Sequence, residues 1–212
     1  MIQAVTFDLW GTLIVDFKEY DRIIQEKREE LLLTAVGEKV SREELVKALK
    51  QSWSQIQSIR KTLKDVPTSE QVRMLQTLLN VDYNLEKPYT EAILCELPRL
   101  NPYTREVLQQ VKTKKGLISN TGRTPGKVLR AVLSDFGLLK FFDVTLFSNE
   151  VGYLKPHPEI FRQATHALGV PPSRILHVGD DITTDIEGAR TAGMQTLLVG
   201  NPSDLQKVLE LV

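Results

Sequence analysis

Glycine is distributed very unevenly along this chain, and its distribution limits what the chain can fold into. Residues 15–98 contain one glycine, Gly37, whereas 1–14 and 99–212 contain the other eleven. Glycine marks tight turns between strands and helices and places where backbones approach closely. A glycine-poor block inside a glycine-rich chain therefore predicts an all-helical insertion over 15–98. The α/β core that carries it is expected to consist of 1–14 and 99–212.

The apolar positions inside this block predict four helices. The first covers about 16–35 and ends just before the single glycine. The second and third are expected to begin at capping boxes at 41–44 and 68–71, where a hydroxyl side chain accepts a hydrogen bond from the first turn. The fourth covers about 86–97, because Pro98 ends the helical pattern.

The flanking parts of the chain alternate between short apolar runs and amphipathic stretches. The runs are rich in Val, Ile, Leu and Phe, and they predict strands near 3–7, 116–118, 143–147, 174–178 and 195–199. The amphipathic stretches predict helices near 103–114, 125–136, 158–168, 183–192 and 203–211. Strands that alternate with helices are typical of a parallel sheet covered on both faces.

Composition excludes several classes of protein. The 212 residues carry 27 basic and 27 acidic side chains, and a nucleic-acid binder usually has a basic excess. A single cysteine, Cys95, excludes a disulfide framework and favours a reducing compartment. The first residues lack the pattern of a signal peptide, and no apolar run approaches the roughly 20 residues of a membrane helix, so we expect neither. We expect a cytoplasmic globular protein, monomeric or homodimeric, that binds neither nucleic acid nor membrane.

Polar residues follow the predicted strands at the positions where a parallel sheet binds its ligand. Asp8 follows the first strand, 119–121 follow the second, Lys155 precedes a helix, and Asp180 and Asp185 follow the fourth strand. Carboxylate oxygens suit Mg²⁺, which keeps waters and a substrate phosphate in its shell. A lysine and the N–H groups at helix starts suit phosphate oxygens. This pattern predicts a phosphate and a divalent cation at one rim.

These segments resemble the four motifs of the haloacid dehalogenase superfamily, in order and in spacing. The chain has FDLWGTL for the first, LISN for the second, GYLKPHPEIF for the third and HVGDDITTD for the fourth. The stretch DIEGARTAGM that follows is typical of the subfamily with a helical cap inserted after the first motif. The resemblance covers essentially the whole chain. It implies a Rossmann-like three-layer α/β core with a cap formed by a bundle of α-helices.

The resemblance also implies an activity and roles for individual residues. It makes the chain a Mg²⁺-dependent phosphatase of small phosphorylated metabolites, with Asp8 as the nucleophile that takes up the phosphoryl group. The implied catalytic residues are Asp8, Thr12, Ser119 and Lys155. The implied substrate and phosphate contacts are Leu9, Trp10, Ser119, Asn120 and Lys155. The implied metal ligands are Asp8, Asp180, Asp185 and the backbone carbonyl of Trp10.

Two points about the acidic and basic groups stay open. Asp181 or Asp185 is expected either to hold a metal-bound water or to orient Lys155. Trp10 stands where family phosphatases usually have a second Asp, which protonates the leaving group and then activates water. That help is typically worth about 10²–10⁴-fold, and an indole cannot supply it. We therefore expect Mg²⁺ binding to be intact and acid-base catalysis to be impaired or relocated.

Trp10 also supports an alternative, because the dehalogenases of the superfamily carry an aromatic residue at this position. The alternative is a metal-independent L-2-haloacid dehalogenase that uses Asp8 as its nucleophile. The cluster of Asp180, Asp181 and Asp185 favours the phosphatase, since these carboxylates beside Asp8 would repel one another without a cation. A signalling receiver domain and a non-catalytic binding protein are further alternatives.

The cap is expected to open for substrate and close against water, with hinges near 14–17 and 97–102. Trp53 has two interpretations: it completes the apolar stripe of the second helix, which we favour, or it projects toward the rim and selects substrates. We expect Cys95 to be a small core residue of the fourth helix. The three histidines are expected to have packed or solvated roles.

Overall fold

The centre of the molecule is a five-stranded sheet. The protein was studied as a computed structural model that describes residues 1–15 and 17–212. The strand order is β5-β4-β1-β6-β7, and every neighbouring pair is parallel. The strands are β1 (Ala4–Phe7), β4 (Lys114–Ser119), β5 (Val144–Phe147), β6 (Ile175–Gly179) and β7 (Gln195–Leu198). The predicted α/β fold is therefore confirmed, with each strand close to its predicted range.

Ten α-helices occur in the described residues. In chain order they are α1 (Phe17–Val36), α2 (Arg42–Arg60), α3 (Thr68–Leu79), α4 (Glu86–Thr90), α5 (Thr104–Gln110), α6 (Gly126–Asp135), α7 (Ser148–Val151), α8 (Pro158–Leu168), α9 (Gly188–Thr191) and α10 (Val208–Leu211). Short 3₁₀ segments occupy Gly37–Lys39, Glu91–Leu94, Leu139–Phe141, Pro172–Arg174 and Pro202–Lys207. A π-helical segment covers Ile182–Glu187. None of these helices is both long enough and apolar enough to cross a bilayer.

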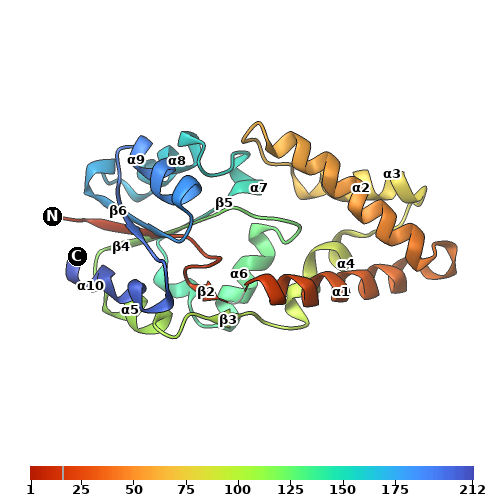
Figure 1. Cartoon of the computed structure of the whole chain (residues 1–212), viewed down its shortest axis with the longest axis horizontal. Coiled ribbons are helices and arrows are strands. Elements are labelled where there is room, and N and C mark those ends of the chain that lie inside the picture. The colour runs from red at the N-terminus through yellow and green to blue at the C-terminus, as the bar shows by residue number, and fades with distance from the viewer. Residues whose placement is uncertain (16) are drawn as a thin grey trace.

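Helices cover both faces of the sheet, as the alternation of side chains along each strand requires. In β1, Val5 and Phe7 belong to an apolar cluster with residues of α5, α6 and α10. Ala4 faces the other way, into a cluster with residues of α8 and α9. Figure 1 shows α8 and α9 on one side of the sheet and α5, α6 and α10 on the other. These three layers bring the carboxyl ends of β1, β4 and β6 to one rim.

Three predicted helices are less regular than expected. The helix expected at 86–97 is α4 followed by a 3₁₀ segment that ends at Leu94. The one expected at 203–211 is mostly 3₁₀ before α10, and the one expected at 183–192 begins as a π-helix. Apolar spacing locates such elements but does not distinguish i+3, i+4 and i+5 hydrogen bonding over one or two turns.

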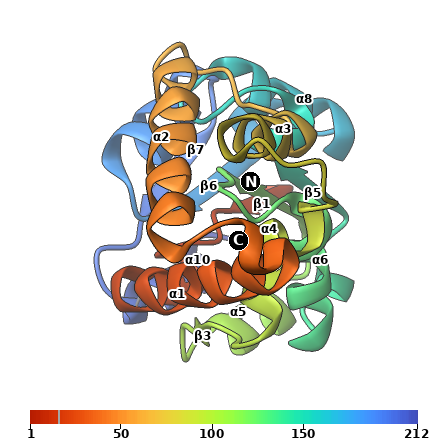
Figure 2. The same cartoon turned by 90° about the vertical axis from the view of Figure 1, so that its right-hand side faces the viewer.

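The segment 17–97 lies between the two parts of the sheet domain and has its own apolar core. Buried side chains of α1 to α4 form one cluster, which includes Leu32, Leu45, Leu75 and Tyr89. In Figure 1 these helices extend away from the sheet, and Figure 2 shows α1 lying across the lower part of the view with α2 upright above it. We call this segment the helical insertion. The predicted start of its first helix at residue 16 lies outside the described residues.

Two details of the helical insertion differ from the sequence prediction. The capping box at 41–44 is confirmed: Ser41 Oγ accepts from Glu44 N, and Glu44 accepts from Ser41 N. The capping box predicted at 68–71 is wrong, since α3 begins at Thr68 and no side chain caps it. Cys95 was expected in the core, but it follows a 3₁₀ segment and is exposed.

A short antiparallel ribbon joins the sheet domain to the helical insertion. Its strands are β2 (Ile14–Val15) and β3 (Arg99–Leu100), and they lie at the two points where the chain passes between these parts. Asn101 fixes the exit by donating to the backbone oxygens of Thr12 and Pro202. The division into a core and a cap at 15 and 98, and the hinges proposed there, stay predictions.

The loop after α2 makes a second, non-covalent attachment to the sheet domain. Leu154 N donates to Leu63 O at 2.9 Å, and Asp65 N donates to Gly152 O at 3.1 Å. The buried Asp65 carboxylate accepts from Ser148 Oγ at 2.5 Å and from Thr121 Oγ1 at 3.2 Å. We call this group the Asp65 cluster. It ties the far end of α2 to the region of α7.

Candidate active site

Lys155 lies between two carboxylates at the rim of the sheet. Its Nζ is 2.5 Å from Asp8 Oδ1, after β1, and 2.5 Å from Asp185 Oδ1, on the π-helical segment. All three residues are almost completely buried, with 5% of Asp8, 3% of Lys155 and 1% of Asp185 exposed. Buried charged groups are stable when they are paired and hydrogen-bonded in this way. Asp8 is 147 residues and Asp185 is 30 residues from Lys155 in the sequence, so the fold brings the three predicted residues together from distant segments.

A second set of contacts holds Lys155 and Asp185 in position. The backbone of Lys155 exchanges two hydrogen bonds with the Asn120 side chain, since Lys155 N donates to Oδ1 at 2.7 Å and Nδ2 donates to Lys155 O at 3.0 Å. Asp185 Oδ1 also contacts His177 Nε2 at 3.2 Å, and Asp185 Oδ2 accepts from Asp181 N at 3.1 Å. Both oxygens of Asp185 are therefore already bound by protein groups.

The ionisation of these groups follows from burial and from their mutual repulsion. Burial raises the pKa of Asp8 to about 7, with Lys155 opposing the rise and Asp185 adding to it. Burial also raises the pKa of Asp180. Burial would raise the pKa of Asp185 too, but Lys155 and His177 hold it below its usual value. Asp8 is thus the carboxylate whose negative charge is least stabilised by its surroundings.

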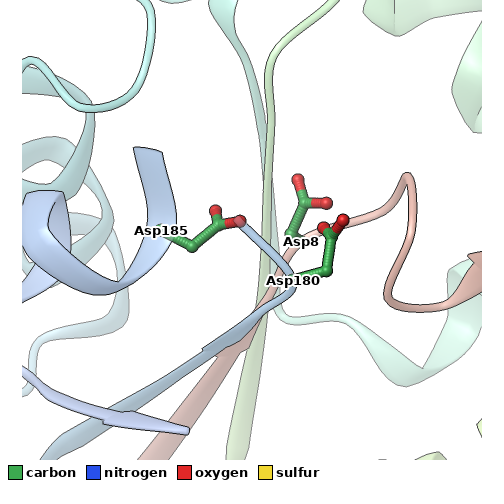
Figure 3. A group of neighbouring side chains, drawn as sticks. All are labelled: Asp8, Asp180 and Asp185. Carbon is green, nitrogen blue, oxygen red and sulfur yellow. The ribbon is translucent and has the colours of Figure 1, made fainter. Parts of the chain in front are cut away.

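Three carboxylates of this site are close enough to share a cation. Oxygens of Asp8, Asp180 and Asp185 lie within 4.8 Å of one another. Figure 3 shows Asp8 and Asp180 side by side, with Asp185 pointing toward them from the π-helical segment. Asp180 is exposed, and the contact from Thr12 Oγ1 to its Oδ1 is long, at 3.4 Å. An oxygen-rich group of this kind suits Mg²⁺, and Asp180 has the most accessible oxygens.

Two glycines allow the acidic groups to approach the backbone. A Cβ at Gly11 would overlap the Asp180 carboxylate, and Gly11 also has a φ of +82°. A Cβ at Gly179 would overlap Cβ and Cγ of Asp185. Positions 11 and 179 therefore need glycine, because a side chain there would displace Asp180 or Asp185.

The remaining predicted site residues differ in their access to solvent. Trp10 and Asn120 line a cavity beside Asp8, together with Asp181. Thr12 and Ser119 are completely buried, and neither is among the described residues that line this cavity. The Leu9 side chain packs in the apolar core, and its carbonyl oxygen accepts from the backbone of the next turn.

The cavity has a volume of about 500 Å³ and lies between the sheet domain and the helical insertion. Asp8, Lys155 and Asp180 line it from the sheet domain. Trp53 lines it from the helical insertion, so our expectation that Trp53 completes the core stripe of α2 is wrong. The other three positions of that stripe are buried as predicted, at Leu45, Leu49 and Ile56.

Sequence reasoning missed two kinds of residue at this site. His177 is buried between Thr6 Oγ1, at 2.9 Å from Nδ1, and Asp185, so it supports the site from beneath. Its place in a strand two residues before Gly179 was the available signal. Arg28 and Arg123 also line the cavity, and nothing in their sequence context distinguishes them from solvated arginines.

Comparison with known proteins agrees with this geometry. The family model for haloacid dehalogenase-like hydrolase matches residues 2–193. The chain belongs to this family of hydrolases. The expectation drawn from the four motifs is therefore confirmed at the level of the family and of a hydrolytic enzyme.

Individual relatives are similar to the chain at lower identity. A phosphoglycolate phosphatase of Shigella boydii is 28% identical over 210 residues, covering 91% of this chain and 79% of the relative. A haloacid dehalogenase-like hydrolase domain-containing protein 3 of Bos taurus is 34% identical over 120 residues, covering 52% of this chain and 46%, about half, of the relative.

Solved structures share the fold. A HAD phosphatase from Thermococcus onnurineus has a TM-score of 0.66 at 23% identity, with 98% of each chain covered. A 2-haloacid dehalogenase from Pseudomonas syringae has a TM-score of 0.67 at 22% identity, covering 100% of this chain and 99% of the other. Since one fold carries both activities, the choice between them depends on the residues of the site.

Proposed function

We propose that the protein is a Mg²⁺-dependent phosphatase of small phosphorylated metabolites, and that it acts through an aspartyl-phosphate on Asp8. The observation that carries this proposal is the buried Asp8–Lys155 pair with Asp180 beside it at the wall of a cavity. The similarity to phosphoglycolate phosphatases supports it. We also propose that 15–98 act as a cap and that the enzyme works in the cytoplasm.

We assign the role of nucleophile to Asp8. Lys155 holds its Oδ1 and leaves the other oxygen available for attack on phosphorus. Attack forms the bond between Asp8 and phosphorus and breaks the ester bond, and the alcohol oxygen leaves with the bonding electron pair. Water then cleaves the acyl phosphate, which regenerates the Asp8 carboxylate and releases inorganic phosphate.

The carboxylates of the site differ in how well they can bind a Mg²⁺ ion. We assign its direct ligands to Asp8, Asp180 and the backbone carbonyl of Trp10, and assign Asp185 to orienting Lys155, because both Asp185 oxygens already have protein donors. When bound, the cation neutralises negative charge shared between the substrate phosphate and the carboxylates. Lys155 and the backbone N–H groups near Asn120 contribute positive charge to the same end of the cavity.

Trp10 determines which leaving groups allow rapid turnover. It lines the cavity two residues after Asp8, where an acid would protonate the departing oxygen. We expect rapid turnover of activated esters and acyl phosphates, which need little protonation, and slow turnover of simple alkyl phosphates.

Hydrolysis of p-nitrophenyl phosphate tests the proposal. We expect turnover that requires Mg²⁺, stops in excess EDTA and is lost in Asp8→Asn. The matched control is Asp82→Asn, an exposed residue outside the cavity, which should keep full activity. Turnover that is indifferent to EDTA, or that survives Asp8→Asn, would contradict the proposal.

The second candidate function is a haloacid dehalogenase, and the observation that favours it is Trp10. It uses the same nucleophile but needs no metal. Halide release from 2-chloropropionate in the presence of EDTA would support it. We expect none, because Asp180 beside Asp8 would be uncompensated without a cation.

A further inference from the structure

Three arginines line the cavity in addition to the groups around Asp8. One of them, Arg60, is paired with Asp65, and the other two are Arg28 and Arg123. Arg28 comes from α1, with 4% of its surface exposed, and Arg123 comes from the loop that follows β4. Each belongs to a different part of the molecule, so they meet only where the helical insertion faces the sheet domain. Burial lowers the pKa of Arg28 to about 10, with Arg123 contributing, and the group stays charged near neutral pH.

Among the described residues, the groups that accept hydrogen bonds from these guanidinium groups are all neutral. Arg28 donates to Tyr89 O at 2.7 Å and to Gln25 Oε1 at 3.0 Å. Arg123 donates to the same Gln25 Oε1 at 3.1 Å and to Leu49 O at 3.3 Å. Within the described part of the chain, neither arginine has a carboxylate within 4.0 Å. Asp21 also lines the cavity, and its charge acts on both arginines, but it is exposed and forms no ion pair with either.

Arg123 has an unused donor. Its Nε is buried and has no hydrogen-bond partner among the residues that the structure describes. Its guanidinium lies over the Trp53 ring, 4.3 Å from the centroid, so the aromatic ring holds it in place. Buried charges without a counter-ion are costly, and natural proteins usually pair them. An anion from outside the chain would satisfy the Nε donor of Arg123 and offset this charge.

We propose that Arg28 and Arg123 form a second anion subsite, so that the substrate carries a carboxylate or a second phosphate besides the phosphoryl group that Asp8 attacks. Asp8 and Lys155 hold the reacting phosphate, and the arginines hold the other anionic group in the same cavity. Arg–carboxylate and Arg–phosphate contacts are strong and geometrically specific. Trp53 positions Arg123 and is not itself a ligand. The subsite rests on the proposed phosphatase function and narrows its substrate class.

The test compares esters that differ only in the second group. The probes are 2-phosphoglycolate, with a carboxylate, 2-hydroxyethyl phosphate, which is neutral there, and ethylene glycol bisphosphate, with a second phosphate. We expect the wild-type protein to prefer an anionic probe over the neutral one by about 10- to 100-fold in kcat/KM, the worth of one charge-assisted contact. The preferred anionic probe identifies whether the subsite takes carboxylate or phosphate.

The decisive variant is Arg123→Gln, because Arg28 also anchors α1 to Tyr89 and its loss could unfold the helical insertion. We expect this variant to lose the preference through a raised KM for the anionic probe, while kcat/KM for the neutral probe changes by less than about 3-fold. The matched control is Arg130→Gln, an arginine also placed over an aromatic ring, Phe147, but outside the cavity. It should keep the preference.

The outcomes separate the subsite from the phosphatase function. Equal loss on all three probes in Arg123→Gln, or no preference in the wild-type protein, would overturn the subsite while leaving the phosphatase intact. If turnover of these alkyl esters is too slow to measure, p-nitrophenyl phosphate still tests the phosphatase function, and calorimetric binding of 2-phosphoglycolate and ethylene glycol bisphosphate to Asp8→Asn decides the subsite. Weaker binding of either after Arg123→Gln is added supports it, and unchanged or absent binding of both overturns it.

Discussion

Asp8 and Asp185 share one ammonium group, yet the fold treats their charges differently. Besides Lys155, Asp185 has two further contacts, with His177 and Asp181 N, whereas the second oxygen of Asp8 has no such donor among the described residues. A nucleophilic carboxylate needs an oxygen that is available for attack, whereas a carboxylate that positions another group has to be held by hydrogen bonds. The difference between these two carboxylates therefore matches the two roles that we propose for them.

The raised pKa of Asp8 predicts a pH dependence of stability. Between its ordinary value of 3.8 and about 7, the folded state keeps a proton on Asp8 that the unfolded state has lost, so this group makes stability fall as the pH rises. Each pKa unit corresponds to about 1.4 kcal/mol. In urea unfolding with EDTA present, Asp8→Asn should gain stability relative to the wild-type protein from pH 4 to pH 8. Parallel curves for the two proteins would contradict this.

Asp180 and Asp185 should respond differently to loss of charge. Asp180→Asn removes an exposed carboxylate from the proposed Mg²⁺ site, so the Mg²⁺ concentration for half-maximal activity should rise by about 10-fold or more. Asp185→Asn removes a partner of buried Lys155 and should destabilise the protein by about 3–5 kcal/mol, lowering kcat with little change in the Mg²⁺ requirement. Mg²⁺ titrations and urea unfolding of both variants measure this. A reversed pattern would make Asp185 the direct ligand.

At the scale of elements, the π-helical segment gives the site its shape. Asp181 O accepts from both Asp185 N and Ile186 N, and the Asp181 side chain accepts from Thr184 N. This turn places Asp185 against the end of β6, where Gly179 leaves room for it. The position of the π-helical segment against β6 thus depends on the absence of a side chain at Gly179.

Gly179→Ala should therefore damage the site more than the fold. Its Cβ would displace Asp185, and with it Lys155, and a shift of about 1 Å can cost on the order of 10²-fold in rate. Gly200→Ala is the matched control after β7, since its Cβ would meet only Asp204 Oδ2, at 3.5 Å. Kinetics with p-nitrophenyl phosphate compare them. Equal activity of the two variants would show that the site tolerates the shift.

The elements that the sequence predicted well are those with a clear period or a fixed motif. The five strands and α1 to α3 follow from apolar spacing, and the rim residues Asp8, Lys155 and Asp180 follow from their places after strands. The irregular segments were not predictable, because one or two turns carry too little periodicity. Arg28 and Arg123 were also missed, since an arginine looks the same in sequence whether it is solvated or buried.

At the scale of the whole molecule, the Asp65 cluster should contribute to stability. Asp65→Asn removes the charged acceptor of Ser148, Thr121 and Arg60, which lies 3.2 Å away. We expect a loss of about 3 kcal/mol in urea unfolding and faster proteolysis in the loop 61–67. Asp82→Asn, exposed in the helical insertion, is the control and should change neither. Unchanged proteolysis in Asp65→Asn would mean that other contacts hold this loop.

The same attachment has a kinetic consequence. The β2–β3 ribbon and the Asp65 cluster join the two parts of the molecule at two separate places, the ribbon in the lower part of Figure 1 and the loop after α2 in the upper part. A swing about the ribbon has to break backbone pairing at 63–65 and a buried acid's hydrogen bonds before the cavity widens. Opening of the cavity would then be the slowest step, and release of phosphate would be slower than cleavage of the ester. A stopped-flow burst followed by a slower steady state is the signature of that order of events.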